Sequence, residues 1–295
     1  MPEGHTLHRL ARDLNKDLMG KTLEVSSPQG RFVDAASLDG ASLRRAFAIG
    51  KHLFLELDRA LVHVHLGLFG KMKRKKLGLP PRASARLRLV SSESAWELTG
   101  PTCCECQTPT AFEALKARLG ADPLGDSARP RALGERLRRS RRPIGALLLD
   151  QSFFAGIGNV YRAEILFLAK INPEAPGSAL TPAHVNLLWR LAKELLKRGE
   201  EHNRIVTVKG AGGRAKRAEA LYCYKRSTCR ICESTIARSM TGGRAMFHCP
   251  GCQPLPASPP AEAAPLAAAP VTGIRRRRGP ERRRSTASRR PPRRR

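Results

Sequence analysis

The sequence predicts an α+β protein, in which a β-rich first domain flanked by helices precedes a helical region and a cysteine hairpin. Three changes of pattern support this. Residues 3–18 carry apolar side chains at helical spacing, and residues 21–97 carry short alternating apolar runs broken by glycine. Helical spacing returns over residues 135–200, and residues 221–252 hold two pairs of cysteines.

The first helix is predicted from one apolar face. Its members recur three and four residues apart: Leu7, Leu10, Ala11, Leu14 and Leu18. The strands are predicted from alternation in residues 53–57, 61–65 and 85–89. A glycine- and proline-containing stretch from Gly120 to Gly134 is typical of a hinge.

The helical region divides into three apolar segments. Residues 144–149 form the first and residues 160–169 the second. Thr181 and Pro182 open the third, because threonine caps a helix and proline suits its first turn. The glycine turn Gly156-Ile157-Gly158-Asn159 separates the first two segments. This turn is either a simple corner between helices or a cradle for phosphate at a helix amino terminus.

The cysteine hairpin predicts a structural zinc site. Its two pairs, sixteen residues apart, are Cys229, Cys232, Cys249 and Cys252. Two such pairs close a tetrahedral shell around one zinc ion without an open position, so His248 is given no role. A second group, Cys103-Cys104-x-Cys106, lacks a partner pair, and we interpret it as surface or half-buried thiols.

The charge balance predicts a polyanionic partner. Of the formal net charge of +29, residues 275–295 contribute +11 through twelve arginines and one glutamate, so the remainder carries +18. A generally basic surface is the plainer alternative. Residues 253–273 are rich in alanine and proline and are expected to be disordered.

The sequence gives no sign of a membrane protein. No apolar run reaches the roughly 20 residues needed to span a bilayer, and polar residues interrupt the amino terminus early. We therefore expect a cytoplasmic, nucleoid-associated protein. In that compartment cysteines stay reduced, which favours a metal site over a disulfide.

Position 2 holds a candidate nucleophile. Removal of Met1 would expose the secondary amine of Pro2, which can attack an aldehyde-like carbon such as C1′ of a deoxyribose and form an iminium. Glu3 stands beside it as a candidate proton donor or shuttle. A purely structural proline at the start of a helix is the alternative.

Two cations are further candidates. Lys51, in the turn between two predicted strands, is either a solvated turn residue or a cation that reaches the phosphate and leaving oxygen of a bound sugar. Arg244, five residues before Cys249, is placed to grip a nucleic-acid backbone. Asn159 offers a side-chain donor at the glycine turn.

Five motifs in order resemble the formamidopyrimidine-DNA glycosylase / endonuclease VIII family over about residues 2–253. They are Pro2-Glu3-Gly4, Gly50-Lys51, Arg118 to Pro123, Leu149 to Leu166, and Gly243-Arg244 ahead of Cys-Pro-Gly-Cys-Gln. The opening Pro-Glu-Gly-His looks most like the endonuclease VIII branch in its actinobacterial form. The resemblance implies a β-sandwich with an amino-terminal helix, then a helix-two-turns-helix domain and a zinc finger. We place these at residues 1–124, 125–220 and 221–253, followed by a linker and Arg-rich tail at 254–295.

The resemblance also implies roles for matching positions. Pro2 forms the Schiff base and Glu3 donates the proton in base removal. Lys51 matches the lysine of β-elimination, and Arg244 matches the arginine of δ-elimination and phosphate contact. Arg118 and Asn159 match DNA-contacting positions. In departure from the family, Thr6 stands where a second glutamate is common, and Gly67 lacks a polar side chain that some relatives carry.

The expected partner is damaged DNA, bound by a monomer. Leu68 and Phe69 would fill the gap left by an extruded base. The enzyme would remove oxidised bases, pyrimidines in preference to 8-oxoguanine, and then cut the strand by β- and δ-elimination. The competing hypothesis is a non-catalytic zinc-finger binder of damaged or structured nucleic acid. The tail either adds non-specific DNA affinity, which we favour, or docks an acidic protein.

Overall fold

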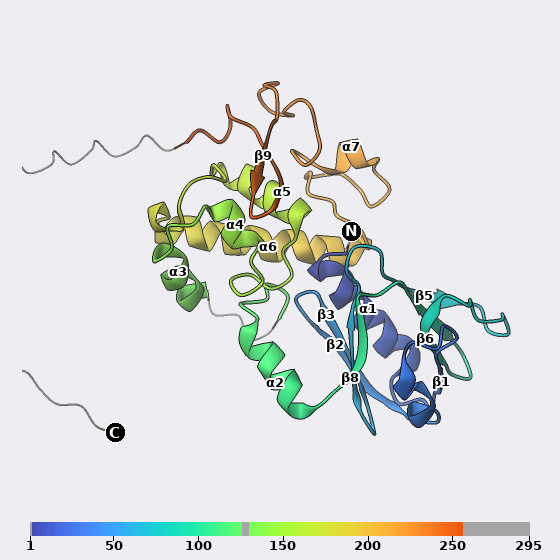
Figure 1. Cartoon of the computed structure of the whole chain (residues 1–295). Coiled ribbons are helices and arrows are strands. Elements are labelled where there is room, and N and C mark those ends of the chain that lie inside the picture. The colour runs from blue at the N-terminus through green and yellow to red at the C-terminus, as the bar shows by residue number, and fades with distance from the viewer. Residues whose placement is uncertain (1, 126–129, 256–295) are drawn as a thin grey trace, which may run out of the picture. The chain divides into compact units, whose positions relative to one another are not determined.

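The computed structural model describes residues 2–125 and 130–255 (Figure 1). Its first half is a two-sheet sandwich with one long helix. Each sheet has four antiparallel strands, in the orders β1-β6-β7-β5 and β2-β3-β4-β8. The elements are α1 (Gly4–Leu18), β1 (Glu24–Ser26), η1 (Val33–Leu38), β2 (Leu43–Ile49), β3 (His52–Leu57), β4 (Leu61–His65), β5 (Lys71–Lys75), β6 (Ala85–Val90), β7 (Ala95–Thr99) and β8 (Cys103–Gln107).

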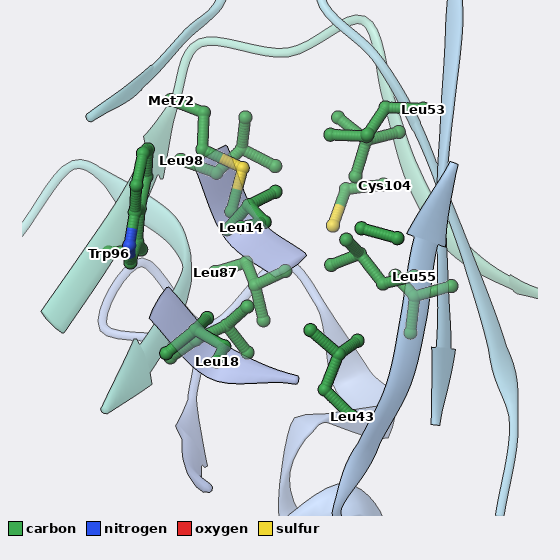
Figure 2. Close-up of a cluster of buried hydrophobic side chains, with 14 of the residues drawn as sticks. Leu14, Leu18, Leu43, Leu53, Leu55, Met72, Leu87, Trp96, Leu98 and Cys104 are labelled. Carbon is green, nitrogen blue, oxygen red and sulfur yellow. The ribbon is translucent and has the colours of Figure 1, made fainter. Parts of the chain in front are cut away.

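The sandwich core lies between the sheets and includes the apolar face of α1. Figure 2 shows side chains from α1 and from both sheets converging there: Leu14, Leu18, Leu43, Leu53, Leu55, Met72, Leu87, Trp96, Leu98 and Cys104. The amphipathic helix and the alternating strands expected from the sequence are thereby confirmed, because their apolar faces meet in one core.

The second half is helical and ends in a two-stranded hairpin. Its elements are α2 (Pro109–Arg118), α3 (Pro130–Arg138), α4 (Ile144–Leu149), α5 (Asn159–Ala169), η2 (Gly177–Ala179), α6 (Pro182–His202), α7 (Arg217–Ala220), β9 (Ala237–Thr241) and β10 (Arg244–His248). Thr181 caps α6 as expected, because its hydroxyl accepts the N–H of His184 at 3.2 Å.

A separate apolar core holds the helices together. It includes buried side chains of α4, α5 and α6 and reaches Met246 of the hairpin. Residues 126–129 of the predicted hinge lie outside the described part of the chain. The same is true of residues 256–295, which make up all but the first two residues of the predicted linker and tail. Among the described residues, no helix is both long and apolar enough to cross a membrane.

Candidate active site

The Glu3 carboxylate is fully buried at the amino terminus of α5. It accepts the backbone N–H groups of Gly158 at 2.7 Å, Val160 at 2.9 Å and, at longer range, Tyr161. These donors and the helix dipole favour an anion at this position. Burial nevertheless raises the pKa of Glu3, against the opposing effects of Lys51 and the backbone donors. A carboxyl group with a raised pKa can hold and donate a proton.

This arrangement bears on the two alternatives for the glycine turn, a simple corner between helices or a phosphate cradle. The N–H groups of Gly158, Val160 and Tyr161 already donate to the carboxyl group of Glu3, so these three are not available for phosphate. Glycine is required at position 158, because a Cβ there would lie 2.3 Å from the Cδ of Glu3. The backbone of Gly4 also contacts the turn, where its N–H donates to the carbonyl oxygen of Gly156 at 2.8 Å.

Lys51 is carried by the β2–β3 turn. Gly50 has a φ of +59° there, and its N–H donates to Oδ2 of Asp122 at 2.6 Å. A Cβ at position 50 would lie 2.8 Å from that of Ala155, so only glycine permits this close approach to the helical region. Burial lowers the pKa of Lys51 to about 8, an effect that Glu3 partly offsets and Arg244 reinforces.

One pocket of about 430 Å³ brings the candidate reacting groups together. Pro2, Glu3, Lys51 and Arg244 all line it. Arg244 begins β10 and is exposed, so its side chain can reach a ligand. Residues far apart in the sequence, from positions 2 to 244, therefore share one cavity.

A buried arginine that the sequence analysis missed holds the hairpin in place. Arg162 of α5 donates to the carbonyl oxygens of Thr241 at 2.7 Å and Gly145 at 3.0 Å, and to Oδ1 of Asn159 at 2.5 Å. Asn159 in turn donates to the carbonyl oxygen of Ala245 at 2.9 Å. Asn159, expected to contact DNA, thus also ties α5 to β10.

A buried carboxylate on the same helix makes a second anchor. Glu164 accepts the backbone N–H groups of Tyr222 at 2.7 Å, Cys223 at 2.8 Å and Tyr224 at 2.7 Å, as well as the hydroxyl of Thr207. The only signal in the sequence was a pair of charged residues within an otherwise apolar helix. Such residues are buried only when paired, and their partners lie far along the chain.

Leu68 and Phe69 form an exposed apolar tip on the β4–β5 loop. Their side chains are 53% and 81% exposed, and Leu68 also lines the pocket. Gly67 precedes them with a φ of +63°, and a Cβ there would lie 2.3 Å from Cγ2 of Thr102. A polar side chain at position 67 would therefore clash with Thr102, which explains why glycine stands there.

Arg118 lies apart from this pocket. It is exposed at the end of α2 and lines a neighbouring opening between α2 and the β2-β3-β4-β8 sheet. His65 lines both openings, which places them next to each other.

The four cysteines of the hairpin cluster as expected. Their Sγ atoms lie within 4.8 Å of one another, with 3.8 Å between Cys229 and Cys252 and 3.3 Å between Cys232 and Cys249. A zinc ion with Zn–S bonds of about 2.3 Å separates its ligands by about 3.8 Å. The donor set therefore fits one structural zinc ion, as in a zinc finger.

Comparison with known proteins agrees with this fold and site. The family model described as Formamidopyrimidine-DNA glycosylase N-terminal domain matches residues 1–101, and the one described as Formamidopyrimidine-DNA glycosylase H2TH domain matches residues 119–209. Endonuclease 8 1 of Mycobacterium tuberculosis is 43% identical over 267 residues, which cover 86% of this chain and 100% of that protein. Formamidopyrimidine-DNA glycosylase of Chloroflexus aurantiacus is 39% identical over 288 residues, covering 86% and 98%.

A solved structure supports the architecture. The complex between Lactococcus lactis Fpg and an abasic site containing DNA superposes with a TM-score of 0.72 at 24% identity, covering 85% of this chain and 99% of that one. Fold, zinc-finger cysteines and relatives together define the class of protein, a DNA glycosylase with AP lyase activity. The chain belongs to the formamidopyrimidine-DNA glycosylase / endonuclease VIII family.

Proposed function

We propose that this enzyme removes oxidised pyrimidines from DNA through a Schiff base on Pro2 and then cuts the strand by β- and δ-elimination. The observation that carries the proposal is the single pocket lined by Pro2, Glu3, Lys51 and Arg244. The preference for pyrimidines rests on the similarity to a protein named Endonuclease 8 1.

Base removal needs a nucleophile and an acid. The secondary amine of Pro2, once Met1 is removed, attacks C1′ of the deoxyribose, and the base leaves with the electron pair of its bond to C1′ and with the proton that the amine gives up. Glu3 supplies a proton to the opening sugar ring, a role suited to a carboxyl whose pKa is raised by burial. The resulting iminium draws electrons from C2′, so loss of the C2′ proton releases the 3′ phosphate.

Two cations serve elimination. Lys51 stabilises charge on the leaving oxygen, and its lowered pKa leaves the ammonium as the main form near neutral pH. Arg244, exposed at the mouth of the pocket, binds a flanking phosphate and assists the second elimination at the 5′ side.

The remaining assigned residues hold the DNA. Leu68 and Phe69 enter the gap left by the extruded nucleotide, for which their exposure leaves them free. Arg118 contacts the DNA strand beside the pocket. Asn159 lines another opening together with Arg238, and there it contacts DNA through the amide N–H that is not bonded to Ala245. Zinc bound by the four cysteines stabilises the hairpin that presents Arg244.

A panel of oligonucleotides, each with one oxidised base, tests the activity. We expect excision of oxidised pyrimidines at a higher kcat/KM than 8-oxoguanine, and products cut on both sides of the lesion. Pro2→Gly should abolish both steps, whereas Glu3→Gln should lose base excision and retain cleavage of abasic-site DNA. Glu24→Gln, which changes an exposed carboxylate of β1, is the matched control and should behave as the parent. Binding of lesion DNA without any excision would support the non-catalytic alternative instead.

The tail and the cellular setting complete the proposal. The enzyme acts as a monomer at the nucleoid, and residues 275–295 add non-specific affinity through their twelve arginines. Deletion of residues 254–295 should weaken binding to undamaged duplex and flatten the dependence of log K on log salt concentration. An unchanged slope would reject the DNA-binding role of the tail.

A further inference from the structure

A second cluster of metal-ligating side chains lies outside the pocket and the zinc finger. It consists of His63 on β4 with Cys103 and Glu105 on β8. His63 pairs directly with Glu105 across the two strands, and Cys103 is two residues from Glu105. Side chains two apart on a strand share a face, so the sheet itself brings the three together.

The spacing of the three ligand atoms suits one metal ion. Nδ1 of His63 lies 3.4 Å from Sγ of Cys103 and 3.8 Å from Oε1 of Glu105, and all three atoms lie within 4.8 Å of one another. Around a tetrahedral zinc ion these nitrogen–sulfur and nitrogen–oxygen separations are about 3.6 and 3.4 Å. The cluster therefore needs only small side-chain adjustments to close on an ion.

The surroundings of His63 also match a metal ligand. The side chain is buried, and its Nε2 lies 2.9 Å from Nδ1 of His52. A histidine that binds metal through one ring nitrogen commonly donates the other N–H to a neighbouring acceptor, which fixes the ring. His52 supplies that acceptor, and its ring stacks on His63 with the centroids 5.1 Å apart.

Access to the cluster is open on one side. Cys103, Glu105 and His63 line the opening of about 730 Å³ between the sheet and α2, and the Glu105 side chain is 58% exposed. Three protein ligands leave a fourth position for water on that side. The other cysteines of β8 do not take part, because Cys104 lies in the sandwich core (Figure 2) and Cys106 packs against the same core.

We propose that His63, Cys103 and Glu105 form a second divalent metal site, selective for zinc and distinct from the zinc finger. The mixed nitrogen, sulfur and oxygen set suits zinc better than magnesium or calcium, which prefer oxygen alone. Binding replaces the thiol proton of Cys103 with the metal, so one proton is released for each ion bound.

Zinc content of the full-length protein tests the site. After equilibration in a buffer of fixed free zinc, elemental analysis should give two zinc ions per chain for the parent and one for Cys103→Ser. Cys106→Ser is the matched control on the same strand, since its thiol faces the core, and should retain two. Glu105→Gln alters a largely exposed side chain and should lower zinc occupancy without affecting folding.

Cobalt provides an independent readout. Cobalt(II) added to protein that carries one equivalent of zinc, enough for the zinc finger alone, should produce a thiolate-to-metal charge-transfer band that Cys103→Ser loses and Cys106→Ser keeps. One zinc ion in the parent would overturn the proposal. So would a second ion that survives both Cys103→Ser and Glu105→Gln, because that ion would bind elsewhere.

Discussion

Replacement of Arg162 by methionine should detach the zinc hairpin from α5. Methionine keeps much of the apolar stem but donates no hydrogen bond. The carbonyl oxygens of Gly145 and Thr241 and Oδ1 of Asn159, which now accept at 3.0, 2.7 and 2.5 Å, would lose their buried donor. A hydrogen bond from a charged donor is worth about 1.5–3 kcal/mol, so we expect the loss of these three to cost at least about 3 kcal/mol.

The assay is thermal unfolding at constant zinc concentration. For a domain of this size about 1 kcal/mol shifts the midpoint by roughly 2–4 °C, so Arg162→Met should lower it by about 6 °C or more. Arg238→Met removes an exposed arginine of β9 in the same hairpin and should change stability by less than about 0.5 kcal/mol. Similar midpoints for both variants would refute the assignment of Arg162 as the buried anchor.

Three further predictions concern the pocket and the loop. Gly158→Ala places a Cβ 2.3 Å from the carboxyl carbon of Glu3 and should reduce the rate of base excision about 100-fold. Gly212→Ala, which adds a Cβ in open space, should leave that rate unchanged, and equal rates for the two variants would contradict the prediction. Burial lowers the pKa of Lys51 to about 8, so the rate of cleavage of abasic-site DNA should fall as the pH rises through 8 and the ammonium loses its proton. Lys51→Arg should shift this fall to higher pH, and a fall at the same pH in the variant would assign it to another group. Phe69→Ala should leave the unfolding midpoint unchanged but weaken binding to lesion DNA by about 1–3 kcal/mol, as measured by fluorescence anisotropy. Val33→Ala, at a comparably exposed site, should leave binding to lesion DNA unchanged.

Local patterns predicted the elements whose apolar faces are continuous. The face of α1 and the alternation in β3 and β4 required no knowledge of distant partners. Strand β8 was missed, because Cys103–Gln107 shows no clear alternation and becomes a strand by pairing with β4.

In the candidate site too, local sequence identified some residues, whereas contacts between distant residues became visible only in the fold. Pro2 and Lys51 could be singled out from their positions in the sequence, and the zinc cysteines from their spacing. The contact of Glu3 with the α5 amino terminus joins residues 155 or more positions apart, and the partners of Arg162 lie up to 83 positions away. Periodicity contains no information on such pairs, so these anchors emerged only from the fold.

The identity of the nucleophile is the most direct test of the proposed mechanism. Lys51 is the structural rival, because its lowered pKa also makes it a candidate amine within the same pocket. Borohydride should trap the protein on abasic-site DNA, and mass spectrometry of the digested adduct should place the sugar on the amino-terminal peptide at Pro2. A sugar attached to Lys51, or a purified protein that retains Met1 and still becomes trapped, would contradict the account.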